Sequence, residues 1–187
     1  MNVYDFDKTI LRGDSTTLFL AFLVRRQPSL LRFSPRCLAA WFRYLTGGVN
    51  KTAAKQRLFS IFSAVRDMDG AVRDFWEKGK NRVTQRYLLE RKDTDVVVSA
   101  SPRFLIEPIC TLLGVQTLIA SEVDKKTGVF DGLNCYGEEK VRRFRDVFPD
   151  AEVERFYSDS LSDAPMAALA REAFLVKGEQ LRPWPGQ

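Results

Sequence analysis

Residues 95–102, with the sequence DVVVSASP, decide the fold. The three valines form a β-branched apolar run that is typical of a strand buried on both faces. Ser101 and Pro102 then predict the start of a helix, with the serine as its N-cap and the proline in its first turn. Gly114 is the residue type that commonly closes such a helix. A buried strand followed directly by a helix indicates an α/β domain.

The chain on either side of this unit repeats the same alternation. Further strands are predicted at residues 1–5, 115–120, 153–157 and 174–177, helices at 138–148 and 162–173, and a hairpin at 121–131. Strands that alternate with helices predict a parallel sheet with helices on both faces.

The segment from Asp14 to Lys92 departs from the alternation, because it is helical in pattern throughout. Ser15 is a suitable cap for its first helix, which Gln27-Pro28 ends. Breaks are predicted at Ser34-Pro35, Gly47-Gly48 and Asp69-Gly70. We therefore expect an all-helical insert after the first strand.

Composition excludes several mechanisms. The 187 residues include no histidine, so neither a Ser-His-Asp relay nor an HExxH zinc site can be built. Any catalysis must use carboxylates, hydroxyls, amines or a metal ion. With 45% hydrophobic residues, a chain of this length can bury a full core without disulfides. One domain, or one domain with a small insert, is expected.

The cysteine count and the N-terminus predict a cytoplasmic protein. The three cysteines lie far apart and form no CxxC pair, which favours a reducing compartment. The first residues, MNVYDFDK, carry acids where a signal peptide has basic and apolar residues. The longest unbroken apolar stretch, at 18–24, is seven residues, far too short to span a membrane.

The charge of the chain is unevenly distributed. Residues 13–59 contain eight Lys or Arg and one acid, a net charge of +7, which leaves −2 for the rest of a chain whose total is +5. Such asymmetry indicates an anionic partner, namely a phosphorylated substrate, a lipid surface or a nucleic acid.

Two carboxylates stand in the sequence DFDKT, residues 5–9, directly after the first predicted strand. Asp5 is ionised near its ordinary pKa of about 3.9, so it needs no base to act as a nucleophile. A neighbouring carboxylate favours the protonated form of Asp7, which suits proton donation to a leaving group. The alternative is a solvated turn in which the aspartates bond their own backbone.

Other polar residues follow the later strands, and the carboxyl ends of parallel strands meet at one edge of a sheet. Ser99 ends the valine strand and could bind an anion, or cap the helix. Lys140 could stabilise a phosphoryl group, or belong to solvated ion pairs such as Glu139 with Arg143. Asp159 and Asp163 lie one helical turn apart on the same side, and capping by Asp159, Ser160 or Ser162 is the alternative to a role in the site.

Taken in order, DFDKT, VVVSAS, Lys140 and YSDSLSD resemble the four motifs of the haloacid dehalogenase superfamily. The resemblance covers essentially the whole chain, and the insert resembles the helical cap of subfamily IB, typified by phosphoserine phosphatase. It implies a Rossmann-like core domain at 1–12 and 80–187 and a cap domain at 13–79.

The resemblance also implies roles for individual residues. Asp5 would be the nucleophile that becomes an aspartyl-phosphate, and Asp7 the general acid and base. Mg²⁺ would be held by Asp5, the carbonyl of Asp7 and Asp159, with Asp163 orienting the metal shell or Lys140. Ser99 and Lys140 would hold phosphoryl oxygens and Thr9 would brace the loop, while Asp14 and Arg57 are further candidates for contact with the substrate.

The departures from the family concern the substrate. Phosphoserine phosphatases have Ser-Gly-Gly after the second motif and a glutamate nine residues after the nucleophile, where this chain has Ser99-Ala100-Ser101 and Asp14. We expect a Mg²⁺-dependent phosphatase acting on a small phosphorylated molecule. A phosphotransferase, a phosphatase for a lipid phosphate such as phosphatidylglycerophosphate, and a basic nucleic-acid-binding protein are the alternatives. No nucleic-acid partner is expected, and peripheral contact with a membrane stays open.

Overall fold

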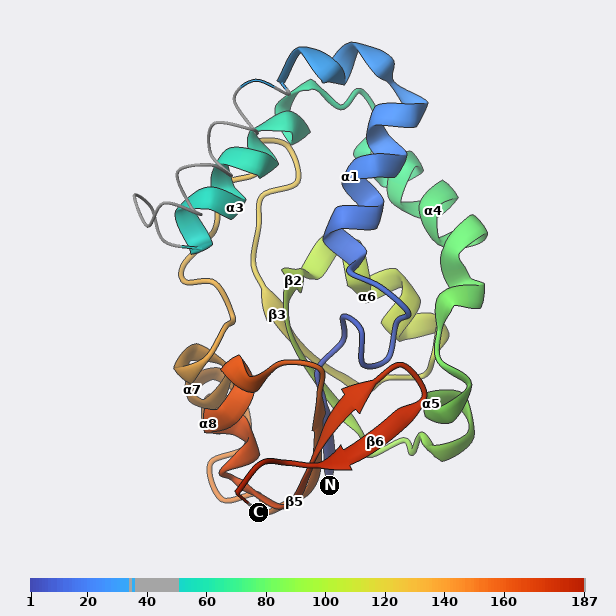
Figure 1. The fold of residues 1–187 in the computed structure, drawn as a ribbon. Helices are drawn as coiled ribbons and strands as arrows, with labels where there is room; N and C mark the ends of the chain where they lie inside the picture. Colours follow the sequence, from blue (N-terminus) through green and yellow to red (C-terminus); the bar gives the residue numbers. More distant parts are fainter. Residues whose placement is uncertain (34, 36–50, 187) are drawn as a thin grey trace.

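The computed structural model describes residues 1–33, 35 and 51–186, and a six-stranded sheet lies at its centre (Figure 1). The strands are β1 (Asn2–Tyr4), β2 (Val96–Pro102), β3 (Thr117–Ser121), β4 (Val153–Ser158), β5 (Ala170–Lys177) and β6 (Gln180–Pro183). Their order is β3-β2-β1-β4-β5-β6, and only the β5–β6 pair is antiparallel. The predicted α/β fold with a parallel sheet is confirmed, and β6 is an additional strand that was not predicted.

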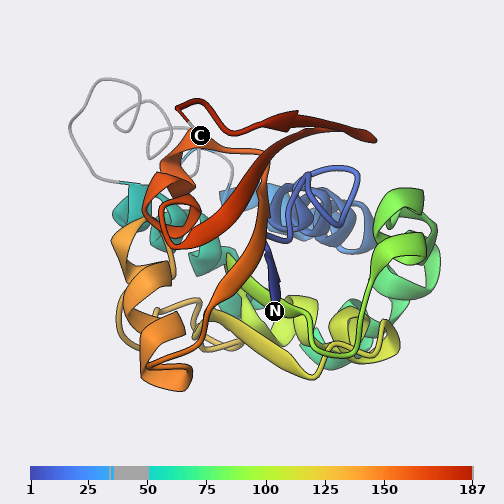
Figure 2. The same ribbon diagram turned by 90° about the horizontal axis from the view of Figure 1, so that it is seen from below.

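Helices cover both faces of the sheet. Val97 belongs to one buried cluster, together with Tyr87 of α5 (Gln85–Glu90) and Leu105 of α6 (Arg103–Leu112). Its neighbours Val96 and Val98 belong to a second cluster, which includes side chains of α7 (Glu138–Val147) and α8 (Ala164–Ala167). Figure 2 shows α5 and α7 on opposite sides of the strands. The valine run is therefore buried on both faces, as its composition predicted.

The described elements between β1 and α5 are all helical. They are α1 (Ser15–Arg26), η1 (Pro28–Phe33), α3 (Lys51–Phe59), η2 (Ser60–Ala64), α4 (Met68–Gly79) and η3 (Lys80–Arg82). Figure 1 shows α1, α3 and α4 beyond the carboxyl end of β1, and we call these three helices the helical insert. Its domain boundaries at residues 13 and 79 stay a prediction. In the described part of the chain, no helix has the length and apolar character needed to cross a bilayer.

A hairpin that follows β3 packs against the helical insert. Val123 and Phe130 form its antiparallel bridge, as the predicted hairpin at 121–131 requires. The Phe130 ring stacks on Phe59 at a centroid distance of 5.7 Å. Lys125 pairs with Asp69 of α4 at 2.7 Å. The hairpin thus contacts both α3 and α4.

Several local predictions are wrong. Asp14, not Ser15, caps α1, because its carboxylate accepts the N–H of Thr17 at 2.7 Å. The Asp69-Gly70 break lies inside the first turn of α4, which Asp67 caps. The helix predicted at 162–173 is only η4 (Leu161–Asp163) and α8, since β5 begins at Ala170. The breaks at Ser34-Pro35 and Gly47-Gly48 include residues outside the described ranges.

Candidate active site

A cavity of about 170 Å³ opens at the carboxyl ends of the strands. It lies where the loops after β1, β2 and β4 meet α1, α3 and the loop before α7. Its lining residues are Asp5, Asp7, Lys8, Asp14, Lys55, Ala100, Tyr136, Lys140, Asp159, Ser160, Ser162 and Asp163. Five of the twelve are aspartates and three are lysines, so the cavity is strongly polar.

Asp5 is the residue that follows β1. Its N–H donates to the carbonyl of Tyr157 at 2.8 Å, which continues the pairing of β1 with β4 beyond the end of β1. The side chain is buried, and Oδ1 accepts a bond from Lys140 Nζ at 2.6 Å. Burial raises the pKa of Asp5 to about 7, although Lys140 opposes the rise. This carboxylate is therefore fixed in position and only partly compensated in charge.

Lys140 is a buried ammonium between two carboxylates. Its Nζ donates to Asp5 Oδ1 and to Asp163 Oδ2, the latter at 2.8 Å, and the residue is 2% exposed. Ser158 Oγ donates to the same Asp163 oxygen at 2.7 Å. Burial opposes the charge of Lys140, but the two carboxylates outweigh it and raise its pKa above the usual value. Lys140 is not a solvated helix charge, although its neighbour Glu139 does pair with Arg143 at 2.7 Å.

Asp7 is held by two serines that were predicted to be helix caps. Its Oδ1 accepts the backbone N–H of Ser15 at 2.7 Å, and its Oδ2 accepts the hydroxyl of Ser101 at 2.5 Å. The Ser15 and Ser101 hydroxyls lie 3.0 Å apart. Burial, and secondly Asp14, raise the pKa of Asp7. The prediction that Ser101 caps α6 is wrong, because Pro102 is the N-cap and no side chain caps this helix.

Ser99 and Thr9 lie beneath the cavity rather than in its wall. Ser99 is 1% exposed, and its Oγ accepts the N–H of Ser101 at 3.1 Å. Thr9 is fully buried, and within the described residues its hydroxyl has no hydrogen-bond partner. The role of Thr9 in bracing the loop agrees with this buried position but stays a prediction, and its side chain does not line the cavity.

The two predicted substrate contacts near the insert differ in position. Asp14 lines the cavity as well as capping α1. Arg57 is exposed on α3 and lies outside the cavity wall. Lys55, two residues earlier, lines the cavity and donates to the carbonyl of Ala100 at 3.1 Å. Of Lys55 and Arg57, Lys55 is thus the one that faces the site.

Asp159 follows β4 and lines the cavity. Its carboxylate is 22% exposed and lies 3.9 Å from the ammonium of Lys8. Burial raises the pKa of Asp159, and Lys8 opposes this. Lys8, Tyr136, Ser160 and Ser162 are wall residues whose place in the site the motifs did not predict. Lys8 could have been found from its position beside Asp7, but Tyr136 follows no strand and carries no comparable signal.

The donor set suits Mg²⁺, a hard cation that prefers carboxylate and carbonyl oxygens and keeps several waters. Among the described residues, no group of three or more His, Cys, Asp or Glu side chains is arranged to hold a metal ion. That Asp5, the Asp7 carbonyl and Asp159 hold Mg²⁺, with Asp163 orienting the metal shell or Lys140, stays a prediction. Asp7 uses its carboxylate on Ser15 and Ser101, and Asp163 uses one oxygen on Lys140 and Ser158. The Asp5 and Asp159 carboxylates with the Asp7 carbonyl remain a suitable set.

The chain belongs to the haloacid dehalogenase-like hydrolase family, whose sequence model matches residues 3–168. It is a phosphatase-like hydrolase of that family. The chain is 30% identical to the protein CicA of Caulobacter vibrioides over 184 residues. The aligned region covers 90% of this chain and 82% of CicA.

Two solved structures share the fold. A Bordetella pertussis protein of unknown function superposes with a TM-score of 0.77 at 23% identity, over 92% of this chain and 87% of that one. A phosphoserine phosphohydrolase-like protein of Francisella tularensis gives 0.60 at 18% identity, over 92% and 86%.

Proposed function

We propose that this protein is a Mg²⁺-dependent phosphatase that hydrolyses a phosphate monoester through an aspartyl-phosphate on Asp5, with Asp7 as general acid and base. The observation that carries the proposal is the pairing of two differently held carboxylates in one cavity. Asp5 contacts a buried ammonium, whereas Asp7 contacts hydroxyl and amide donors. Carboxylates in different environments can serve as nucleophile and proton donor.

In the first step, an Asp5 carboxylate oxygen attacks phosphorus and the bond from phosphorus to the ester oxygen breaks. The protonated Asp7 gives its proton to that oxygen, so an alcohol leaves. The raised pKa of Asp7 favours the protonated form that this step needs. Lys140 keeps Asp5 in place and offers positive charge beside the oxygens of the transferring group.

In the second step, a water molecule attacks the phosphorus of the aspartyl-phosphate. Asp7, now a carboxylate, takes a proton from the water, and the bond from phosphorus to Asp5 breaks. Inorganic phosphate leaves, Asp5 is a carboxylate again, and Asp7 is again protonated. The cycle thus closes without a histidine, which agrees with the composition.

The Asp5 and Asp159 carboxylates and the Asp7 carbonyl would hold Mg²⁺. When bound, Mg²⁺ neutralises negative charge on the phosphoryl oxygens as they approach these carboxylates. Asp163 acts by holding Lys140, with Ser158 as its second partner. Ser99 supports the loop at Ser101 and, through it, the position of Asp7.

The helical insert would serve as the cap of the site. Asp14, the N-cap of α1, and Lys55 of α3 line the cavity wall. They bring charges of opposite sign to the region where the leaving group of a substrate would lie. Residues 13–79 are accordingly proposed as the unit that selects substrates.

The decisive experiment looks for the covalent intermediate. The protein is incubated with Mg²⁺ and a ³²P-labelled phosphate monoester, quenched in acid, and digested for identification of the labelled peptide. We expect label on the peptide that contains Asp5, and neither label nor phosphate release with Asp5→Asn. Full activity in folded Asp5→Asn would overturn the mechanism. Glu152→Gln, a surface change prepared in the same way, is the control and should be labelled like the wild-type protein.

A further inference from the structure

Lys8 occupies an unusual backbone conformation next to the site. Its φ is +56°, and it is the only non-glycine with a positive φ among the described residues. Its N–H donates to the carbonyl of Gly13 at 3.0 Å, which closes the loop that carries Asp7 into α1. Glycine adopts this conformation more readily than any residue with a side chain. Glycine would therefore adopt this backbone conformation with less strain than lysine.

Among the residues that the structure describes, the Lys8 side chain makes one interaction that could stabilise this conformation, and it is weak. Its ammonium lies 3.9 Å from Asp159 Oδ2, beyond hydrogen-bond distance, and the side chain is 60% exposed. Exposed ion pairs of this kind contribute little to stability. The strain at Lys8 is therefore not matched by a stabilising contact, and strained residues cluster at functional sites.

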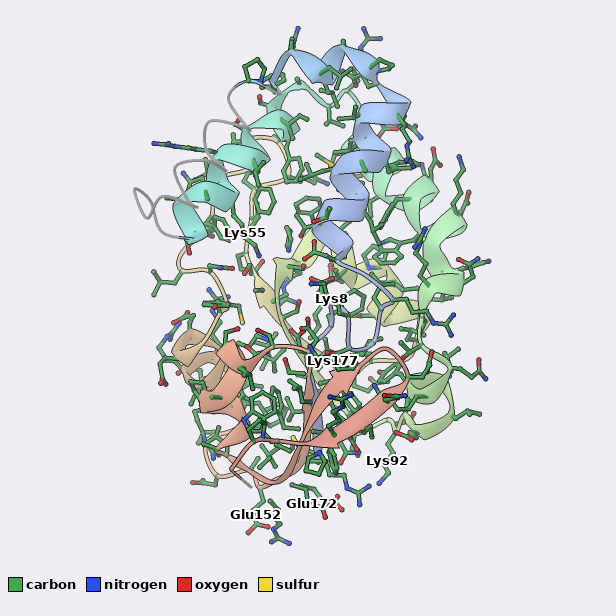
Figure 3. The ribbon with its side chains drawn as sticks, in the orientation of Figure 1. Lys8, Lys55, Lys92, Glu152, Glu172 and Lys177 are labelled. Atoms are coloured by element: carbon green, nitrogen blue, oxygen red, sulfur yellow. The ribbon has the colours of Figure 1, made fainter. Side chains whose placement is uncertain are left out.

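The cavity's three lysines are placed differently. Lys140 is buried between Asp5 and Asp163, and Lys55 is half-buried and donates to the Ala100 carbonyl. Lys8 lines the cavity but is exposed, so its ammonium lies at the mouth of the site. Figure 3 shows it below the start of α1. A flexible stem lets this ammonium move from Asp159 to an incoming anion.

We infer that Lys8 binds a second anionic group of the substrate, a carboxylate or a phosphate, in addition to the phosphoryl group that reacts. This inference rests on the proposed function, because it assigns the reacting phosphoryl group to the Lys140 end of the cavity. The substrate class is then a phosphate ester whose leaving group is itself negatively charged. Lys8 is a specificity-determining residue in this arrangement.

The test uses three esters that differ in one substituent: phenyl phosphate, 3-carboxyphenyl phosphate and 1,3-phenylene bisphosphate. For the wild-type protein we expect KM to be about ten-fold lower for one or both of the substituted esters. The ester that shows the preference identifies the second anion as a carboxylate or a phosphate. In Lys8→Ala and Lys8→Gly the preference should be lost for these short esters, whose substituent reaches Lys8 and not α3, and in Lys8→Arg it should persist. Lys92→Ala removes the same charge from an exposed position outside the cavity wall and should retain it.

A second measurement separates strain from charge. Relative to Lys8→Ala, Lys8→Gly should have a Tm about 2 °C higher, because glycine relieves the backbone while both variants lose the ammonium. Lys8→Gly would then be more stable than Lys8→Ala, although both variants are less selective than the wild-type protein. No wild-type preference among the esters, or an equal change in KM for all three in Lys8→Gly, would overturn the inference.

Failure of the proposed function would look different. If the wild-type protein hydrolyses none of the esters, binding of phenylphosphonate and 3-carboxyphenylphosphonate by isothermal titration calorimetry still tests Lys8. Tighter binding of the carboxylated probe that Lys8→Ala abolishes would support the role of Lys8 without any turnover. Equal binding of the two probes by wild type and Lys8→Ala would contradict it.

Discussion

At the residue scale, the proposed mechanism requires Asp7 to act twice with opposite proton states. Asp7 would donate a proton to the leaving oxygen and later accept one from water, and its hydrogen bonds to Ser15 and Ser101 fix the position of its carboxylate. An amide in its place retains the shape but can neither give nor take the proton. Both steps of the proposed reaction then lose their proton transfer.

Asp7→Asn should therefore lower kcat by about 100-fold or more for an alkyl phosphate. The loss should be smaller in the phosphorylation step with p-nitrophenyl phosphate, whose leaving group needs little protonation. Rapid acid quenching should consequently show accumulated aspartyl-phosphate with this ester. Asp14→Asn, which keeps a good N-cap for α1, is the control for lost charge nearby. A kcat within ten-fold of wild type in Asp7→Asn would show that another group moves the proton.

The sequence predicts the carboxylates of this site better than the residues that hold them. Asp5 and Asp159 directly follow strands, and parallel strand ends converge whatever the loops do. Ser15 and Ser101 have strong local signals for helix caps, so their contacts with Asp7 could not be predicted without the fold. Arg57 and Lys55 are equivalent in the sequence, and only the orientation of α3 distinguishes the wall residue from the exposed one.

At the scale of elements, β5 and β6 show where local pattern fails. Residues 162–173 include an alanine-rich run that favours a helix. The first part of the run forms η4 and α8, but its end pairs with β4 instead, with Arg155 opposite Glu172 and Phe156 opposite Ala173, so β5 begins at Ala170. Tertiary pairing thus overrides propensity. β6 is four residues long, largely exposed and ends in proline, which leaves little apolar pattern to predict it.

Helix α7 carries an ion-pair cluster next to Lys140. The Glu139 carboxylate accepts bonds from Arg142 and Arg143, and its side chain is 9% exposed. Arg142, and then Arg143, lower the pKa of Glu139 to about 2. Because the folded pKa lies below the ordinary value, the stabilisation is present above about pH 4.5. It is lost as the pH falls toward 2.

Glu139→Gln should accordingly lower the free energy of unfolding at pH 7 by about 1 kcal/mol, a value kept small because Arg142 is exposed. The difference from wild type should shrink as the pH falls from 4.5 to 2. Urea unfolding at several pH values measures both effects. Glu152→Gln removes an exposed partner of Arg171 and should change stability by less than about 0.5 kcal/mol. A pH-independent difference for Glu139→Gln would contradict the assignment.

The hairpin after β3 meets the helical insert at Gly128. Its φ is +74°, and a Cβ there would lie 2.1 Å from the carbonyl oxygen of Phe59. Gly128→Ala should therefore lower the free energy of unfolding by about 2–4 kcal/mol, from backbone strain and overpacking together. Gly178→Ala is a matched control, since φ is +63° with no atom within 4 Å of the added Cβ. Equal losses of stability in the two variants would show that the hairpin does not press on α3.

At the scale of the whole molecule, the charges of the cavity demand a cation. Its wall contains five aspartates and three lysines, and a phosphate dianion brings two further negative charges. In a partly buried site such charges repel one another unless they are compensated. Turnover should therefore stop in EDTA and return with excess Mg²⁺. Undiminished phosphate release in thoroughly chelated buffer would show that Lys140 and the other lysines suffice.

The basic charge of residues 13–59 could act on a substrate in two ways, by direct contact or by long-range attraction. Two residues of α3 allow these effects to be separated. Lys55 lines the cavity, whereas Arg57 is exposed outside its wall. If the insert selects substrates by contact, Lys55→Ala should raise KM about ten-fold for an ester whose leaving group is long enough to reach α3, and less for a minimal ester. Arg57→Ala should change KM by less than two-fold at 150 mM salt, because its charge acts only by screened attraction.

Steady-state kinetics of both variants at 20 and 150 mM salt distinguish contact from attraction. A contact at Lys55 should persist at the higher salt, whereas an effect of Arg57 should fade. Equal and salt-sensitive effects of the two variants would show that the basic surface merely draws anions toward the site. Selection of the substrate would then be the work of residues in the sheet-end loops, Lys8 among them.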